Sequence, residues 1–419
     1  MLPDYVINCV HKVAKNEGFT DFKIETKAGS AHGDNFLGIM TAITLTGTRR
    51  KNGQTQSEEL HLLCKAPPRN VIRQKNFATS LVFSREIYIY SKLLPAFVRF
   101  QREKGLSEAD SFLSFPKVYA CEVNEEKQTY ILLMEDLRSK NYEMWPKDET
   151  VDLEHELLVM KELSKFHAIS FAMKDQRPNE FREFQQLTDF FVGIYVKTTI
   201  KSFIKTLIDR SINVLEKPQH KQIMQNFRNT FLERAEKLKS VPYCDEFGIM
   251  LHGDCWNNNF LFQHRNDNKK QLKSICFVDW QLTHYSPPVI DVLYNIFSST
   301  DKPFRDLHYE KLLKTYYSSL SQTIRKLGSD PNKLYTYENF QEQMRKYSDY
   351  ALLLAPMIIT IRLAKAKDVA NLDDYAECLE RGEEADVVHE FDDETQAEFS
   401  KQINGLVTDL VDYGYVKCE

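Results

Sequence analysis

The stretch His252-Gly253-Asp254-Cys255-Trp256-Asn257-Asn258-Asn259, followed after a turn by Val278-Asp279-Trp280, decides how this chain is interpreted. Asp254 and Asn259 stand five residues apart on one short loop, a spacing at which both side chains can face the same cavity. A carboxylate in that position can hold a substrate hydroxyl, while an amide oxygen can ligate a divalent cation. Asp279, arriving on a neighbouring strand, would complete the metal site.

The sequence between the two halves predicts the geometry that such a site needs. Phe260-Leu261-Phe262 is a short apolar run, residues 265–270 form a polar turn, and residues 272–278 are apolar again. This pattern indicates a hairpin that carries Asp279 back beside Asn259. Either half alone would more often be a surface turn or an ordinary strand end. Together they suit phosphoryl transfer, because its transition state spreads charge over the phosphoryl oxygens and depends on positioning and cations.

The upstream sequence contains a candidate ion pair for a nucleotide. Residues 60–65 are predicted to form a strand that ends in Lys65 and is stopped by Pro67-Pro68. A helix begins some twenty residues later, with Glu86 near its start. A lysine on a strand and a glutamate on the adjacent helix form the pair that directs an ammonium group at the α- and β-phosphates. Taken alone, Lys65 would more often be a solvated lysine at a strand end.

Two further segments are candidates for nucleotide contacts. Gly33-Asp34-Asn35 lies in a turn whose backbone N–H groups could cover phosphates, although such a turn more often has no ligand. Residues 129–134 have the pattern of a buried strand and run into Glu135-Asp136-Leu137. In kinase-like folds the exposed backbone of this connector pairs with adenine. Glu135 and Leu137 are therefore candidate adenine contacts through backbone atoms.

Taken in chain order, these motifs resemble the ecdysteroid kinase-like family of insects, often labelled CHK kinase-like and related to choline and aminoglycoside kinases. The resemblance extends from about Gly29 to about residue 370, and Trp280 stands where many members carry Phe. It implies an α+β, two-lobed fold like that of protein kinases. A small antiparallel-sheet lobe would span residues 1–136, and a large helical lobe would span residues 137–419.

The resemblance also implies a role for each residue of the site. Lys65 would contact the phosphates of ATP, and Glu86 would orient it. Asp254 would act as the catalytic base or position the acceptor hydroxyl. Asn259 and Asp279 would ligate Mg²⁺.

Three further polar residues are expected to have structural and not catalytic roles near the site. His252 is expected to brace the loop by hydrogen bonding. Asp291 matches an aspartate that such folds use structurally near the start of the next helix, where an acid also suits the helix dipole. His167 is more readily explained as a satisfied core histidine than as a catalyst.

The acceptor is predicted to be a small hydroxylated molecule. Trp256 stands where protein kinases usually carry lysine, and Pro287-Pro288 follows Asp279 within a dozen residues, which leaves little room for a peptide platform. The family points to an ecdysteroid or another hydroxylated lipophilic compound, including a detoxification substrate. A choline- or ethanolamine-like amino-alcohol kinase is the alternative enzyme, because aromatics could form a cage for a cation. A non-catalytic nucleotide-binding pseudokinase is the alternative from another class.

The composition agrees with an enzyme that acts on small molecules. The 419 residues are 42% hydrophobic, enough for large cores, and the net charge of −5 disfavours nucleic acid as the main partner. The eight cysteines are scattered without zinc spacing, as in a cytoplasmic protein with reduced thiols. Residues 1–13 lack the pattern of a signal peptide, and the longest apolar run, residues 350–361, is too short to span a membrane.

Several helices are expected outside the motifs. The spacing of apolar residues predicts an amphipathic helix over residues 4–17 and further helices over residues 77–94 and 156–171. Residues 189–215 are expected to form one or two long helices, whose Phe190, Phe191, Tyr195 and Phe203 are candidates for the wall of a substrate pocket or for plain core. The acidic residues 373–394 are expected to form a solvated surface segment, with cation recognition as the alternative.

Overall fold

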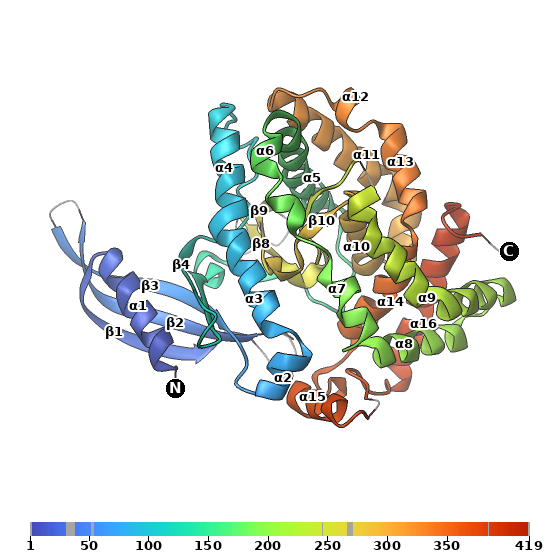
Figure 1. Ribbon diagram of the computed structural model, residues 1–419, viewed down its shortest axis with the longest axis horizontal. Coiled ribbons are helices and arrows are strands. Elements are labelled where there is room, and N and C mark those ends of the chain that lie inside the picture. Colours follow the sequence, from blue (N-terminus) through green and yellow to red (C-terminus); the bar gives the residue numbers. More distant parts are fainter. Residues whose placement is uncertain are drawn as a thin grey trace.

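The computed structural model of the chain has two lobes, an antiparallel sheet at one end and a larger mass of helices at the other (Figure 1). It describes residues 2–30, 38–51, 54–244, 246–265, 271–383 and 385–417. The predicted α+β, two-lobed architecture is therefore confirmed. The division at residues 136 and 137 stays a prediction.

The small lobe is built on a five-stranded antiparallel sheet. Its strands lie in the order β1 (Phe19–Ala28), β2 (Ile39–Lys51), β3 (Gln54–Ala66), β5 (Thr129–Glu135) and β4 (Val118–Asn124). The amphipathic helix α1 (Asp4–Asn16) is present as predicted, and its buried side chains, such as Val6 and Val10, pack against Ile43 and Leu45 of the sheet. The predicted strand of Lys65 and the predicted buried strand before Glu135 are both confirmed, and the structure pairs them in the sheet.

One long helical run lies between the sheet and the helical lobe (Figure 1). After α2 (Val71–Asn76) it comprises α3 (Thr79–Tyr88), a π-helical turn over Ile89–Leu93 and α4 (Leu94–Glu103). The predicted helix is thus confirmed but extends further, because the chain does not stop at Pro95. Proline has no N–H to donate, and here it follows directly on the wider π turn, within the first turn of α4.

The large lobe is mainly helical. Helices α5 (Leu153–Gln176) and α11 (Lys302–Lys326) pack together, as do α10 (Val289–Ser299) and α14 (Asp349–Leu363). Its other α-helices are α6 (Pro178–Phe181), α7 (Phe190–Gly193), α8 (Lys201–Val214), α9 (Pro218–Cys244), α12 (Pro331–Leu334), α13 (Tyr337–Lys346), α15 (Leu372–Glu380) and α16 (Asp393–Asp412). The expected helix over residues 156–171 is confirmed within α5.

Two small sheets carry the loops of the site. One has the order β6 (Tyr142–Met144), β8 (Phe260–His264) and β9 (Leu272–Phe277), and the other pairs β7 (Ile249–Leu251) with β10 (His284–Ser286). Strands β8 and β9 are antiparallel, with Phe260 opposite Phe277. The predicted hairpin is therefore confirmed for its two strands.

Two expectations for the large lobe need correction. Residues 189–215 do not form long helices: α7 ends at Gly193, a 3₁₀ turn covers Tyr195–Lys197, and α8 starts only at Lys201. Glycine and the β-branched pair Thr198 and Thr199 weaken helix in this segment. The acidic segment 373–394 is solvated only in part, because Val387 and Val388 are buried between its exposed acids.

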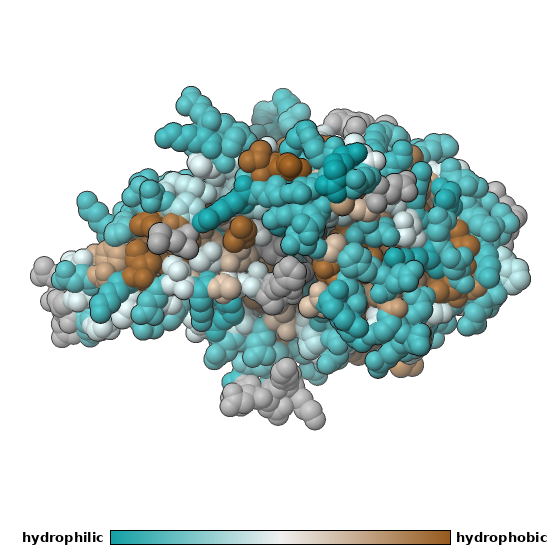
Figure 2. All heavy atoms as spheres, turned by 90° about the horizontal axis from the view of Figure 1, so that it is seen from below, coloured by the Kyte–Doolittle hydropathy of each residue, from teal (hydrophilic) through white to brown (hydrophobic). Residues whose placement is uncertain are grey.

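The surface fits the composition. The face in Figure 2 is mostly hydrophilic, with apolar side chains in small separate groups. None of the helices within the described ranges combines the length and apolar character that a membrane span requires. The apolar run at residues 350–361 lies inside α14, where almost every side chain is buried, so its prediction as a buried helix is confirmed.

Candidate active site

The loop with the His-Gly-Asp motif joins β7 to β8 and is held by the buried carboxylate of Asp291. One oxygen of Asp291 accepts a hydrogen bond from the backbone N–H of His252 at 2.7 Å, and the other accepts from Gly253 at 2.9 Å. Gly253 has a φ of +85°, and an added Cβ would lie 2.2 Å from the carbonyl oxygen of Leu282. The loop therefore needs glycine here both for its conformation and for the close approach of the backbone.

His252 links this loop to the strand of the second aspartate. Its Nε2 donates to the carbonyl oxygen of Val278 at 3.1 Å, and its Nδ1 accepts from the N–H of Asp254 at 3.2 Å. Burial lowers the pKa of His252, so the ring stays neutral and can be donor and acceptor at once. These contacts are those of a brace, as the sequence suggested.

His167 lies in the core behind Asp291. Its two ring nitrogens lie 3.1 Å from Oδ2 of Asp291 and 2.6 Å from the hydroxyl of Tyr316. Burial by itself would raise the pKa of Asp291, but the hydrogen bond with His167 and the other contacts of the carboxylate, including the backbone N–H of Gly253, together outweigh burial, and the pKa is lowered. His167 thus supports the ionised Asp291 from within the core and does not line either of the two cavities described below.

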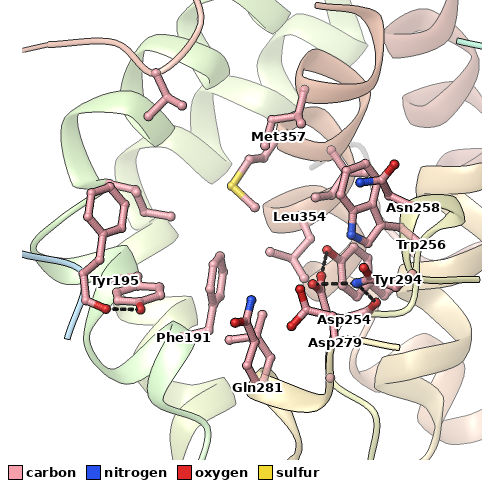
Figure 3. A pocket seen from close by; sticks show the side chains of 18 of the residues that line it. Phe191, Tyr195, Asp254, Trp256, Asn258, Asp279, Gln281, Tyr294, Leu354 and Met357 are labelled. Carbon is pink, nitrogen blue, oxygen red and sulfur yellow. Dashed lines mark hydrogen bonds between the residues drawn. The ribbon is translucent and has the colours of Figure 1, made fainter. Parts of the chain in front are cut away.

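Both carboxylate oxygens of Asp254 accept hydrogen bonds (Figure 3). Oδ2 accepts from Nδ2 of Asn259 at 2.8 Å, and Oδ1 accepts from the hydroxyl of Tyr294 at 2.7 Å. Nδ2 of Asn259 also donates to the backbone carbonyl of Asp254 at 2.9 Å. Burial and then the charge of Asp279 raise the pKa of Asp254 to about 7, against the effect of these donors.

Lys65, Glu86 and Asp279 come together from three different elements. Nζ of Lys65 lies 2.8 Å from Oε2 of Glu86 on α3 and 2.8 Å from Oδ1 of Asp279, which follows β9. Burial would lower the pKa of Lys65, but the two carboxylates outweigh it and raise that pKa, so the side chain is an ammonium ion. Asp279 has a φ of 64°, a left-handed conformation that aspartate adopts more readily than most residues.

The residues at this junction fit a magnesium ion. Because Nδ2 of Asn259 is directed at Asp254, its amide oxygen is left as the ligand atom, and Asp279 adds a carboxylate. Oxygen ligands are those that Mg²⁺ prefers, and Mg²⁺ usually takes few ligands from the protein and the rest from phosphates and water. In the described part of the chain no three His, Cys, Asp or Glu side chains gather as a metal site, so phosphates would have to complete this one.

A nucleotide-sized cavity of about 650 Å³ opens between the lobes beside this junction. Lys65, Glu86, Glu135 and Leu137 line it, together with Asn259 and Asp279 from the other lobe. The backbone N–H of Glu135 donates to the carbonyl oxygen of Lys117, so an adenine contact at Glu135 has to use its carbonyl oxygen. The predicted phosphate contacts Gly33, Asp34 and Asn35 lie outside the described residues.

A second cavity borders the catalytic loop (Figure 3). Asn258, Asn259 and Asp279 line both cavities, and Asp254 lines only the second. The rest of the second wall is mostly aromatic and aliphatic and includes Phe77, Phe191, Tyr195, Phe203, Trp256, Tyr294, Leu354, Met357, Leu372 and Val387. After the ligands that the sequence predicts for them, we call the first, which the predicted nucleotide contacts line, the nucleotide pocket, and the second, which Asp254 lines, the acceptor pocket.

Three of the four aromatic residues predicted as candidates for the pocket wall line the acceptor pocket. Phe191, Tyr195 and Phe203 line the acceptor pocket, but Phe190 does not; its ring lies under the guanidinium of Arg85, 4.5 Å from the centroid. Residues 372 and 387 reach the pocket with apolar side chains, while acids between them pair with the cations of α2, as Asp373 does with Arg73. The described acidic side chains of this segment are not among those that line the pocket.

Sequence reasoning missed three residues of the site. Tyr294 holds Asp254, Gln281 lies 3.4 Å from Nζ of Lys65, and Arg85 donates to the carbonyl oxygens of Thr188 and Thr283. Each stands close to a predicted residue: Tyr294 is three residues after Asp291, Gln281 two after Asp279, and Arg85 directly before Glu86. Helical spacing from Asp291 was the available signal for Tyr294.

A protein-family model matches most of the chain. The model of the ecdysteroid kinase-like family matches residues 32–329. The match includes the strand lysine, the helix glutamate, the catalytic loop and the second aspartate. It ends before α14 and residues 372–387, which complete the wall of the acceptor pocket. No curated protein matches the chain.

Proposed function

This chain belongs to the ecdysteroid kinase-like family, and we propose that it is a magnesium-dependent kinase that transfers the γ-phosphoryl group of ATP to a hydroxyl of a small lipophilic molecule. One observation carries the proposal. A pocket of nucleotide size and an apolar pocket meet at Asn259 and Asp279, and Asp254 stands on the apolar side of the junction. That arrangement brings a phosphate donor and an alcohol to one point.

The residues at the junction supply the parts that phosphoryl transfer needs. Lys65, held by Glu86, places a positive charge at the phosphates, and Asn259 and Asp279 would hold Mg²⁺, which neutralises charge on the phosphoryl oxygens when bound. Asp254 accepts the hydrogen bond of the acceptor hydroxyl. As the bond from the acceptor oxygen to γ-phosphorus forms, the bond from γ-phosphorus to the bridging oxygen breaks, ADP leaves, and the hydroxyl proton passes to Asp254.

The lining of the acceptor pocket favours a neutral lipophilic alcohol, such as an ecdysteroid, over an amino alcohol. Aromatic side chains with an acid beside them, away from the reacting hydroxyl, would favour an amino-alcohol kinase, because together they could enclose the cationic end of its substrate. The acids that line this pocket in the described chain are Asp254 and Asp279, both at the reacting end. The acidic segment instead pairs with surface cations, as Glu380 does with Lys75.

The size of the acceptor pocket sets a condition on this proposal. Its volume is about 140 Å³, whereas pockets for drug-sized ligands usually measure roughly 300–1,000 Å³. A rigid four-ring skeleton therefore enters only if side chains of the wall move. Met357, with its flexible unbranched side chain, is a part of the wall that can yield.

The decisive experiment separates phosphoryl transfer from ATP binding. Asp254→Asn should lower turnover by several orders of magnitude and leave ATP affinity within about a few-fold, because Asp254 faces the acceptor and not the nucleotide. Lys65→Ala should weaken ATP binding itself, since it removes the charge at the phosphates. Calorimetry with ATP–Mg²⁺ is to be run beside product analysis over ecdysteroids, other sterols and amino alcohols.

The possible results of these measurements distinguish the candidate functions. Normal turnover by Asp254→Asn would show that the catalytic loop is misassigned. A wild type that binds ATP–Mg²⁺ and phosphorylates none of these alcohols would contradict the proposal and favour a non-catalytic nucleotide-binding protein. Phosphorylated choline or ethanolamine as the main product would overturn the acceptor class alone.

A further inference from the structure

We propose that Tyr294 is the positioning residue that fixes the direction in which Asp254 faces the acceptor, an inference that rests on the proposed function. A carboxylate bound at one oxygen can still rotate about its Cβ–Cγ bond. The hydroxyl of Tyr294 at 2.7 Å from Oδ1 and the amide of Asn259 at 2.8 Å from Oδ2 hold it at both ends. The side chain of Trp256 also hydrogen-bonds to Asp254, and these contacts together hold the carboxylate in one orientation.

Helix α10 is suited to hold Asp254 in place. Every residue of α10 from Val289 to Ser299 is buried, so the helix is enclosed by the core. Asp291 and Tyr294 are three residues apart and lie on the same face of it. Asp291 binds the backbone N–H groups of His252 and Gly253, and Tyr294 binds the side chain of the next residue. Helix α10 therefore forms hydrogen bonds with three consecutive residues of the catalytic loop, from His252 to Asp254.

The chemistry of tyrosine suits this role. Burial, and then the charge of Asp254, raises the pKa of Tyr294 well above its usual value, so the phenol keeps the proton that it donates. The ring lines the acceptor pocket and lies edge to face on Tyr350, with 6.5 Å between the ring centroids. A carboxylate oxygen has more than one acceptor position, so Oδ1 can take the phenol and an alcohol together. Tyr294 therefore decides which side of Oδ1 remains for the alcohol.

The test is Tyr294→Phe, which removes one hydroxyl and keeps the ring. With an ecdysteroid as probe, kcat should fall roughly 10- to 100-fold, while the KM of the probe and the Kd of ATP stay within about threefold, because orientation and not binding is lost. The recovered share, which is the amount of phosphorylated alcohol formed per ATP consumed, should also fall. Water would compete with a misdirected acceptor, and more ATP would then be hydrolysed. Placing p-aminophenylalanine at this position returns a donor and should restore that share in part.

Tyr350→Phe is the matched control, because it removes a buried hydroxyl from the ring that packs against Tyr294. It should leave kcat and the recovered share within about twofold, as expected for a residue that does not contact the reacting groups. If both variants lose kcat equally and keep the recovered share, Tyr294 is only a packing residue and the inference is wrong.

A second readout does not depend on catalysis. Crystal structures of the wild type and of Tyr294→Phe should show the Asp254 carboxylate turned from its original direction in the variant. If the Asp254 carboxylate kept the same orientation in both structures, the inference would be wrong. A wild type that transfers phosphate to no alcohol would refute the proposed function, and the carboxylate orientation would still decide whether Tyr294 positions Asp254.

Discussion

Asp279 lines both pockets and also forms the ion pair with Lys65. It lines both cavities, accepts from Lys65 at 2.8 Å and adopts a left-handed conformation. Asparagine tolerates that conformation as well as aspartate does. Replacement by asparagine therefore changes the charge and preserves the backbone.

We expect Asp279→Asn to lose phosphoryl transfer and to keep its fold. One carboxylate ligand of Mg²⁺ disappears, and Glu86 remains as the charged partner of Lys65 among the described residues. Turnover is to be measured over a range of Mg²⁺ concentrations, with circular dichroism and the melting temperature as controls. Turnover like that of the wild type at ordinary Mg²⁺ would remove Asp279 from the metal site.

Glu156 is a buried carboxyl group that the proposed reaction does not use. It lies on α5, is fully buried, and neither oxygen has a hydrogen-bond partner within the described chain. Burial raises its pKa from 4.5 to about 8. Between those two values the unfolded chain releases the proton and the folded chain keeps it, so stability falls as pH rises through this window.

The Glu156→Gln variant should remove that pH dependence. Its free energy of unfolding should exceed that of the wild type by about 2–5 kcal/mol at pH 8, and the difference should vanish below pH about 4.5. Denaturant unfolding at several pH values measures this. The control is Glu162→Gln on the same helix, whose carboxylate is paired with Lys165 and should give no such gain. Equal stability of the wild type and Glu156→Gln at pH 8 would show that Glu156 is ionised in the fold.

At the scale of elements, the wall of the acceptor pocket combines parts that are far apart in the chain. Aromatics come from the segment around α7 and α8, aliphatic side chains come from α14, and Leu372 and Val387 come from the segment that packs on α2. These parts share no strand or loop with the nucleotide pocket. The two specificities should therefore be separable by mutation.

Enlarging this wall should favour bulky acceptors. Met357→Ala removes a flexible side chain from a pocket of about 140 Å³, so kcat/KM for tetracyclic sterols should rise by roughly 10-fold or more relative to that for small aliphatic alcohols. ATP affinity should not change. Met134→Ala is the reciprocal control, since Met134 lines only the nucleotide pocket. If Met357→Ala altered ATP binding and not the choice of acceptor, the two pockets would be wrongly assigned.

The elements that sequence reasoning predicted well are those whose signal is local. The 3.6-residue spacing of Val6, Val10 and Val13 defines α1, and the two apolar runs around a polar turn define the β8–β9 hairpin. The helix past Pro95 was missed because the π turn before it has no sequence signal of its own. The acceptor pocket was only partly predicted, since its wall is assembled by tertiary packing and no spacing in the sequence reports which distant side chains meet.

At the scale of the whole molecule, a buried arginine connects the two lobes. Arg85 on α3 is buried and donates to the carbonyl oxygens of Thr188 and Thr283 in the helical lobe. The helix that carries Glu86 is therefore fixed to the lobe that carries Asp279. A nucleotide would add contacts from Lys65 on one side and Asp279 on the other.

ATP–Mg²⁺ should consequently stabilise both lobes in a single thermal transition. At a hundred times its Kd, the ligand should add about 2.7 kcal/mol to the free energy of unfolding. Lys65→Ala should lose most of this shift. Lys75→Ala is the matched control, because Lys75 is exposed, pairs with Glu380 on the surface and should keep the shift. Two separate transitions, only one of them moved by the ligand, would show that the lobes unfold independently.

Asn258, Asn259 and Asp279 line both pockets, so the two pockets adjoin at these three residues. One molecule can therefore occupy both, with an adenosine at one end, a short phosphate bridge at the junction and an apolar tail in the second pocket. Tethering makes the second contact intramolecular and can raise avidity by roughly 10²–10⁴ over either half. Such a bisubstrate inhibitor would draw its selectivity from the tail, because part of the wall that receives it, α14 and residues 372–387, lies beyond the segment that the family model matches.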